Sequence, residues 1–206
     1  MSHLLVLNST PSGAASVSSV LVQEIIDRHR ALDPTTVVTE RNLDTDPLPH
    51  LTSTIVSGVR GQPVSEAELA ARDLSDALVA ELLAADTIVI GAPMHNFSVP
   101  TTLRAWFDHV LRPGVTFGYS EAGPKGLVTG KKAILAIATG GFYSEGPAKP
   151  LDYQEPYLRQ LLGFIGITDV AVVRAEKIGF GPEAREASIA AARAHIAGLV
   201  DQRQAA

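Results

Sequence analysis

The sequence predicts one α/β domain over residues 1–206, built on a parallel sheet of five strands with helices on both faces. Two observations lead to this class. Short apolar runs alternate with segments of helical period, which is the pattern of parallel strands joined by helices. A chain of 206 residues is also too short for a second core, since chains divide mainly beyond about 250 residues. The hydrophobic fraction of 46% against 19% charged excludes a disordered chain.

Five runs have the length and composition of strands that are buried on both faces. They are dominated by Val, Ile, Leu and Ala, and they comprise His3–Leu7, Thr36–Glu40, Thr87–Ala92, Ala133–Ala138 and Val170–Arg174. A further stretch, Val115–Gly130, reads as a pair of short strands around Ser120-Glu121-Ala122-Gly123-Pro124. We expect this pair to form a hairpin that stands off the main sheet.

Helices are predicted between the strands. The first, Ser16 to about Leu32, carries an apolar stripe of Val17, Val20, Leu21 and Ile25. The second, Ser65 to about Ala85, opens with Ser65-x-x-Glu68, the pattern of a capping box. Three more are expected at Thr101–Leu111, Glu155–Ile165 and Glu183–Asp201, the last preceded by Pro182 as its first helical residue.

Five strand–helix pairs of this length fit a flavodoxin-like sheet of strand order 2-1-3-4-5, or a truncated dinucleotide-binding fold. Two connections are too long for either plan, Leu43–Val64 and Phe142–Gln154. Long structureless loops in a compact domain tend to be functional. Trp106 and Phe107 are expected in the core or at a dimer contact, and His109 is expected to be partly exposed.

Ligands of open parallel sheets bind beyond the carboxyl ends of the strands, where the strand order reverses. After the first strand, Asn8 to Ser19 supplies small residues and hydroxyls that lead into a helix N-terminus. Such an end binds anions, and because neither a Walker lysine nor G-x-G-x-x-G is present here, one monoester phosphate is the best fit. An ordinary serine-capped helix is the alternative.

Two other loops are expected at the same edge. Met94 and Phe97 offer polarisable faces for a flat ring, and Asn96 can donate and accept at a ring edge. Gly140 and Gly141 allow the backbone to approach a ligand closely. Each of these two loops alone is better explained as an ordinary turn, but the convergence of three loops on one edge favours a ligand site.

Composition excludes other classes of protein. There is no cysteine for a disulfide or a thiolate metal site, and the six histidines form no H-E-x-x-H motif, so no metal is expected. The net charge of −5 without a basic cluster argues against nucleic acid. No membrane span or signal peptide is expected, which predicts a cytoplasmic protein with small-molecule partners. The G-x-G-x-x-A motif that begins at Gly179 lacks the following strand that a dinucleotide fingerprint needs.

Three longer blocks of sequence resemble a known family. They are Pro93-Met94-His95-Asn96-Phe97, residues 127–133 (LVTGKKA) and residues 162–170 (LGFIGITDV), with Gly114-Val115-Thr116-Phe117 and Tyr119 in addition. These blocks resemble the FMN-dependent NADH:quinone oxidoreductases known as azoreductases, and the similarity covers essentially the whole chain. The resemblance implies a flavodoxin-like fold with FMN as cofactor and NADH or NADPH as co-substrate.

The resemblance also implies roles for individual residues. The FMN phosphate is expected at Ser9, Thr10, Ser16, Val17 and Ser18. The isoalloxazine ring is expected beside Pro93, Met94, His95, Asn96, Phe97, Ala138, Thr139, Gly140 and Gly141. The family is homodimeric with two active sites at the interface, and it implies that Tyr119 and Phe164 reach over the flavin of the partner subunit. Arg60 lies where the family has a lid, and its guanidinium suits anionic dyes or nucleotide phosphates; a solvated loop arginine is the alternative.

The implied activity is a two-step exchange that needs no catalytic side chain, because the flavin performs the hydride transfer. NADH or NADPH reduces the flavin and leaves, and a quinone or azo compound then takes two electrons in the same pocket. Alternatives are a flavodoxin-type electron carrier and an FMN reductase that releases reduced flavin. His95 stands where members of the family often carry Tyr. Either its side chain donates a proton to the electron acceptor, or it only borders the flavin through its backbone.

Overall fold

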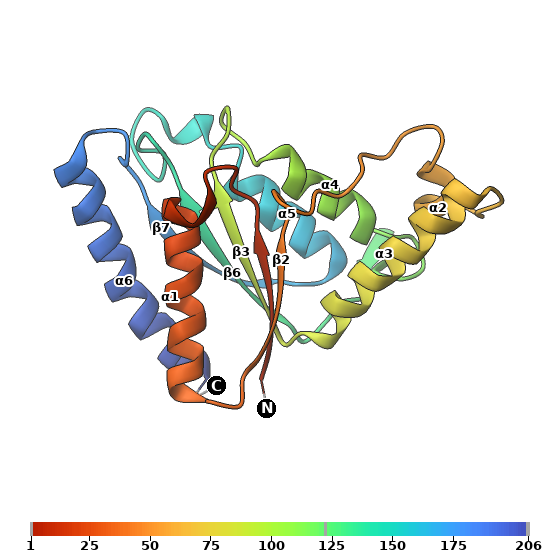
Figure 1. Cartoon of the computed structure of the whole chain (residues 1–206), viewed down its shortest axis with the longest axis horizontal. Coiled ribbons are helices and arrows are strands. Elements are labelled where there is room, and N and C mark those ends of the chain that lie inside the picture. The colour runs from red at the N-terminus through yellow and green to blue at the C-terminus, as the bar shows by residue number, and fades with distance from the viewer. Residues whose placement is uncertain (1, 122, 205–206) are drawn as a thin grey trace.

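The computed structural model describes residues 2–121 and 123–204. Its centre is a parallel sheet of five strands, and these are β1 (His3–Asn8), β2 (Val37–Asn42), β3 (Thr87–Pro93), β6 (Lys132–Ala138) and β7 (Asp169–Ala175). The sheet order is β2-β1-β3-β6-β7 (Figure 1). Counted among themselves along the chain, these strands have the expected order 2-1-3-4-5. The labels skip because β4 (Phe117–Ser120) and β5 (Gly123–Gly126) form a separate antiparallel pair, as expected, although Ala122 between them lies outside the described residues.

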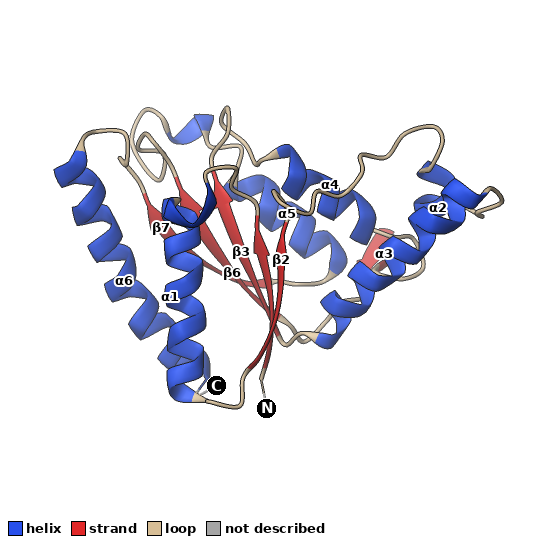
Figure 2. Cartoon of the chain, viewed as in Figure 1, coloured by secondary structure: helices blue, strands red, loops and turns tan. Residues whose placement is uncertain are grey.

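Helices cover both faces of the sheet (Figure 2). One face carries α1 (Val17–Leu32) and α6 (Pro182–Gln204), and the other carries α3 (Glu66–Ala84), α4 (Thr101–Val110) and α5 (Glu155–Ile165). Successive residues of β1 alternate between the two sides, because Leu4 and Val6 belong to the core under α1 and α6 while Leu5 and Leu7 belong to the opposite core. This alternation explains why Leu4 to Leu7 are all apolar, because both faces of the strand are covered.

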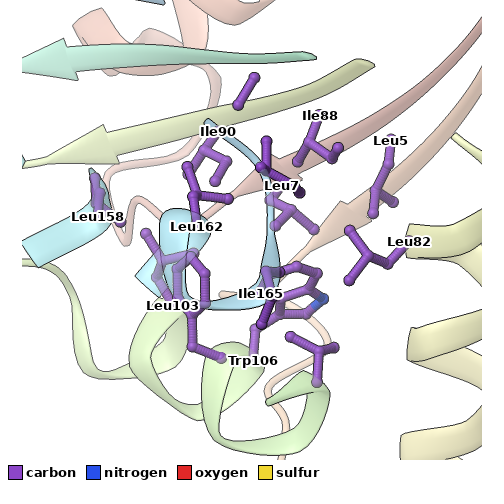
Figure 3. Packing of buried hydrophobic residues seen from close by; sticks show 14 of the residues in the cluster. Leu5, Leu7, Leu82, Ile88, Ile90, Leu103, Trp106, Leu158, Leu162 and Ile165 are labelled. Atoms are coloured by element: carbon purple, nitrogen blue, oxygen red, sulfur yellow. The ribbon is translucent and has the colours of Figure 1, made fainter. Parts of the chain in front are cut away.

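The α4 face of the sheet holds the larger aromatic side chains. Trp106 packs among Leu7, Leu82 and Ile165 in the core shown in Figure 3. Trp106 is 0% exposed and Phe107 is 1% exposed, so of the two expected places, the core or a dimer contact, both residues occupy the core. The alternative place, a dimer contact, is wrong for both residues, since one chain already buries them.

Several local expectations are confirmed at the ends of helices. The Ser65 hydroxyl accepts from the Glu68 N–H at 3.3 Å, while the Glu68 carboxylate accepts from the Ser65 N–H at 2.9 Å, so the capping box is present. Pro182 is the first residue of α6. Among the described residues, none of the helices combines the length and hydropathy that crossing a bilayer requires.

Other expectations are wrong. Strand β2 is an edge strand with largely accessible side chains, and it is not buried on both faces. The first long connection contains a helix, α2 (Val56–Arg60), and the second contains a 3-10 turn, Lys149–Leu151. His109 is fully buried rather than partly exposed, because its Nε2 donates to the carbonyl oxygen of Pro49 at 2.9 Å and so holds the first long connection against α4.

Candidate functional site

The loops after β1, β3 and β6 leave the sheet at its carboxyl edge, which is the upper edge in Figure 1. Hydrogen bonds join neighbouring loops and strands in series across this edge. The Ser9 hydroxyl donates to the Gly91 carbonyl at 2.7 Å, and the Met94 N–H donates to the Ala138 carbonyl at 2.8 Å. The three loops that were expected to converge therefore do form one surface.

The loop after β1 buries three hydroxyl groups at the start of α1. Ser9, Thr10 and Ser18 are all at most 5% exposed. Ser16 occupies the cap position of α1, but its hydroxyl lies 3.1 Å from that of Ser18 and accepts no bond from the N–H groups of the first turn. An ordinary serine cap would satisfy one of those N–H groups. The N-terminus of α1 therefore presents uncapped N–H groups and the positive end of the helix dipole beside buried hydroxyls, a combination that binds anions.

The loop after β3 is a tight turn in a strained conformation. His95 and Ser98 exchange two backbone hydrogen bonds, at 2.9 and 3.0 Å, and the residues between them have positive φ, 47° at Asn96 and 71° at Phe97. Such angles at non-glycine residues cost roughly 1–3 kcal/mol each and cluster at ligand sites. The Phe97 carbonyl accepts from the Tyr153 N–H at 3.1 Å, and the Phe97 ring remains 46% exposed. We refer to the region bordered by the loops after β1, β3 and β6 as the crevice.

The loop after β6 has an unusual backbone arrangement over residues 139–142. The carbonyls of Thr139, Gly140 and Gly141 all accept bonds from the loop between β7 and α6, at 3.2, 3.1 and 2.7 Å. In a planar trans peptide the N–H points opposite to the preceding carbonyl. The N–H groups of Gly140, Gly141 and Phe142 therefore all point away from that loop, and no acceptor in residues 2–121 or 123–204 takes them. We call these three groups the N–H row.

The backbone of the N–H row borders open space at Gly140. A Cβ added to Gly140 would meet no atom within 4 Å, so a flat ligand can approach this backbone closely. Successive N–H groups that share a direction create a concave region of positive potential, suited to an anion or an electron-rich ring edge. The row thus offers polar donors on one side of the crevice, while Phe97 offers an apolar wall.

The structure brings the expected cofactor residues together at this edge, because they occupy the loops after β1, β3 and β6. It does not bring Phe164 or Tyr119 there within one chain. Phe164 lies nine residues along α5 from Glu155, about 14 Å from the end that faces the crevice. The Phe164 ring packs on Phe117 at 4.6 Å between centroids, and Phe117 in turn packs on Tyr119, which is 77% exposed.

Arg60 also lies apart from the crevice. It ends α2, which packs on α3, and its Nη2 is 3.6 Å from the Asp108 carboxylate near the end of α4. A cavity of about 240 Å³ beside Arg60 is also lined by Val115, in the connection that leads to β4. The three expected substrate residues therefore lie on one side of the chain, away from the three loops.

Sequence reasoning missed four residues at the site. Tyr143 packs edge-on against Phe97, and the fully buried Gln154 donates from Nε2 to the Ala92 carbonyl at 3.0 Å. Both lie in the second long connection, whose length was itself a signal of function. Glu176 and Lys177 follow β7, and their place just beyond a strand at the carboxyl edge was the signal that could have found them.

Comparison with known proteins agrees with this fold and shows the family. A family model described as flavodoxin-like fold matches residues 2–200. The chain is 58% identical over 197 residues to an FMN-dependent NADH:quinone oxidoreductase of Hyphomonas neptunium, covering 96% of this chain and 95% of the relative. A protein of the same name from Ralstonia nicotianae is 46% identical, over 99% of this chain and all of the relative. A crystal structure of an azoreductase from Bacillus anthracis superposes with a TM-score of 0.90 at 29% identity, over 98% of this chain and all of the other.

Proposed function

Because this chain belongs to the flavodoxin-like family of FMN-dependent NADH:quinone oxidoreductases and azoreductases, we propose that it binds FMN at the carboxyl edge of its sheet. It takes hydride from NADH or NADPH and passes two electrons to quinones and azo compounds. The observation that carries this proposal is the N–H row, which lies at the same carboxyl edge of the sheet as the uncapped N-terminus of α1. One end of the site suits a phosphate and the other an electron-rich ring.

The residues fit FMN along its length. The buried hydroxyls of Ser9, Thr10 and Ser18 and the first turn of α1 would hold the phosphate, with Ser16 and Val17 contributing backbone N–H groups. Pro93, Met94, His95 and Asn96 would border the ring from the loop after β3. Ala138, Thr139 and the N–H row would border it from the loop after β6.

Bound FMN supplies a ring that accepts a hydride and returns two electrons. The chain's own contribution is binding and electrostatics. The fixed N–H row would stabilise negative charge on the electron-rich ring without reorganising, since its carbonyls are already bonded to the loop after β7. Met94 and Phe97 would exclude water from the ring face, and the nicotinamide and the acceptor would use the remaining pocket in turn.

A second copy of the chain would complete each site. Tyr119 is exposed and Phe164 is held beside Phe117, on the side of the molecule away from the crevice of their own chain. Arg60 lies on the same side. This arrangement supports a homodimer in which these three residues reach the pocket of the other subunit. Sedimentation at micromolar concentration tests it, since a monomer with full activity would contradict a shared pocket.

The experiment that tests the function uses the purified full chain. We expect flavin absorbance with one FMN per chain, and oxidation of NADH or NADPH that depends on added quinone or azo dye. Tightly retained flavin separates this activity from an FMN reductase, and turnover with small acceptors separates it from a carrier that serves other proteins. A protein that neither contains FMN nor can be reconstituted with it would overturn the proposal.

A further inference from the structure

The loop between β7 and α6 holds the segment 139–144 through both its backbone and one buried carboxylate. Backbone bonds run from Lys177, Ile178 and Gly179 to the carbonyls behind the N–H row. Beyond them, Oε1 of Glu176 accepts the N–H of Tyr143 at 2.7 Å and the N–H of Ser144 at 3.0 Å. The segment is therefore held at every residue from 139 to 144 except Phe142, whose ring lies under the Lys177 ammonium at 4.0 Å.

The Glu176 carboxylate is compensated by these two backbone hydrogen bonds. The residue is only 9% exposed, and burying a charge is costly unless it is paired or hydrogen-bonded. No cation forms an ion pair with it within the part of the chain that the structure describes. Its compensation is the pair of charge-assisted bonds from backbone N–H groups, which are stronger than bonds to a neutral acceptor.

These bonds fix where the N–H row ends. The N–H of Phe142 points away from the loop after β7, because the Gly141 carbonyl accepts from Lys177. The next N–H, that of Tyr143, points to Glu176 instead. The peptide plane turns over between the two residues, so Glu176 determines both the last member of the row and the direction in which the Tyr143 side chain leaves the backbone.

The side chain of Tyr143 links this turn to the wall of the crevice. Its ring would lie 2.9 Å from a Cβ added to Gly141, so the ring covers the backbone of the row at this glycine and would have to shift for a larger residue. The same ring packs edge-on against Phe97, with 6.2 Å between centroids. A shift of the Tyr143 backbone would therefore disturb the N–H row and the Phe97 wall together.

We propose that Glu176 is a positioning residue that holds the N–H row and Tyr143 in the geometry that favours the electron-rich, reduced form of the bound ring. This inference rests on the proposed function, since it needs FMN at the carboxyl edge. Glu176 acts through the backbone and does not touch the ring. An N–H row that the Glu176 carboxylate holds in place favours reduced over oxidised FMN. Loss of the hydrogen bonds to Glu176 therefore lowers the reduction potential of the bound flavin.

The test compares Glu176→Gln with Glu176→Ala in the FMN-loaded full chain. Both variants remove the negative charge, but only Gln keeps an oxygen that can accept from Tyr143 and Ser144. The affinities for oxidised and reduced FMN and the midpoint potential are measured. For each variant, the Kd for reduced FMN is divided by the Kd for oxidised FMN. We expect this ratio to be about tenfold larger in Glu176→Ala than in Glu176→Gln. That ratio makes the midpoint potential of Glu176→Ala about 30 mV more negative than that of Glu176→Gln, since this two-electron couple shifts about 30 mV per tenfold change.

Two controls separate positioning from general loosening of the fold. Glu145→Ala removes an exposed charge from the same connection, and we expect it to leave the potential unchanged. Hydrogen exchange in the FMN-loaded protein should accelerate at Tyr143 and Ser144 in Glu176→Ala but not in Glu176→Gln. Equal potentials and equal exchange in the two Glu176 variants would overturn the inference while leaving the proposed function intact, whereas failure of the unaltered chain to bind FMN would overturn the proposed function itself.

Discussion

The ring of Phe97 meets the ring of Tyr143 edge to face, at an interplanar angle of 84°. This contact joins the turn after β3 to the loop after β6, and it is made by a residue whose backbone lies in the left-handed region, with φ of 71°. The chain thus accepts backbone strain at Phe97 in order to keep an aromatic ring at the crevice. Strain of this kind persists only where neighbouring contacts hold it, here the Tyr153 N–H and the Tyr143 ring.

Replacing Phe97 separates strain from function. Phe97→Gly and Phe97→Ala both remove the ring, so we expect both to raise the KM for a neutral quinone severalfold. Only glycine relieves the left-handed strain, so Phe97→Gly should be more stable than Phe97→Ala by about 1 kcal/mol. Thermal unfolding and steady-state kinetics measure the two effects. A KM unchanged in both variants would show that the ring does not line the acceptor pocket.

Ser18→Asp tests the phosphate end of the site. Ser18 is 1% exposed in the first turn of α1, so a carboxylate there would repel a phosphate in a region of low dielectric. We expect the Kd for FMN to rise at least tenfold, about 1.4 kcal/mol. Ser18→Ala removes only the hydroxyl and should weaken binding less. Titration of both variants with FMN measures the two Kd values. Equal affinities of Ser18→Asp and the unaltered chain would show that the phosphate does not bind beside Ser18.

The sheet and the edge at which the three loops lie could be predicted because they follow from local patterns. Leu4 to Leu7 are apolar at each position, which marks a strand covered on both faces, and strand-like runs separated by helical segments restrict the topology even where, as in β2, the strand lies at the edge. The three loops then had to meet at the carboxyl edge. The pattern itself indicated only a hydroxyl-rich segment that leads into a helix, and Ser9 and Ser18 were named individually through the resemblance to the family.

The remaining features depend on contacts between distant segments that leave no local pattern. His109 is buried because the carbonyl of Pro49 accepts its Nε2–H, and nothing near either residue in the sequence indicates that pairing. Helix α2 was missed because it is five residues long and its stability comes from α3, where Arg72 donates to the Gly61 carbonyl at 2.6 Å. Glu176 was missed for the same reason, since its partners are two backbone N–H groups in another loop.

Ser65→Ala should destabilise the fold through the start of α3. The Ser65 hydroxyl accepts the Glu68 N–H, and loss of such a cap costs about 1 kcal/mol. Denaturant unfolding of the FMN-free chain measures the change. Ser53→Ala, in an exposed position of the first long connection, is the matched control and should change stability little. Equal losses in the two variants would show that the hydroxyl does not stabilise α3.

The same cap predicts a pH dependence of stability. Backbone N–H groups of Ser65 and Val64 bond the Glu68 carboxylate and lower its pKa from the ordinary value of 4.5. A carboxyl whose pKa is lowered in the folded state stabilises the fold above its unfolded pKa, and that stabilisation is lost as the pH falls through the folded pKa. We therefore expect Glu68→Gln to narrow the stability difference between pH 7 and pH 3. A difference of the same size in both proteins would contradict the assignment.

His95→Tyr tests whether the imidazole takes part in the reaction. The turn is held by two backbone bonds between His95 and Ser98, which any side chain permits, and the His95 side chain is exposed. We therefore expect FMN affinity to stay within twofold. We also expect kcat/KM for a quinone to keep its dependence on pH between 5 and 8, the range in which histidine exchanges protons. Loss of rate on the acidic side alone would instead identify His95 as a proton donor to the acceptor.

Arg60→Ala tests whether the guanidinium selects anionic acceptors in the pocket of the other subunit. Arg60 and Arg104 both face the Asp108 carboxylate, at 3.6 and 3.5 Å, so Arg104→Ala is a control that removes the same charge and a similar ion pair. Because the Arg60 side chain is 43% exposed, its pair with Asp108 is weak and its charge remains available to a ligand.

We expect Arg60→Ala to lower kcat/KM about tenfold for a sulfonated azo dye and less than twofold for a neutral quinone. We expect Arg104→Ala to change kcat/KM for both acceptors by less than twofold. Raising the salt concentration should reduce the advantage of the unaltered chain on the dye, since exposed charges are screened. If Arg60→Ala loses the same factor on dye and quinone, Arg60 supports the pocket without recognising charge.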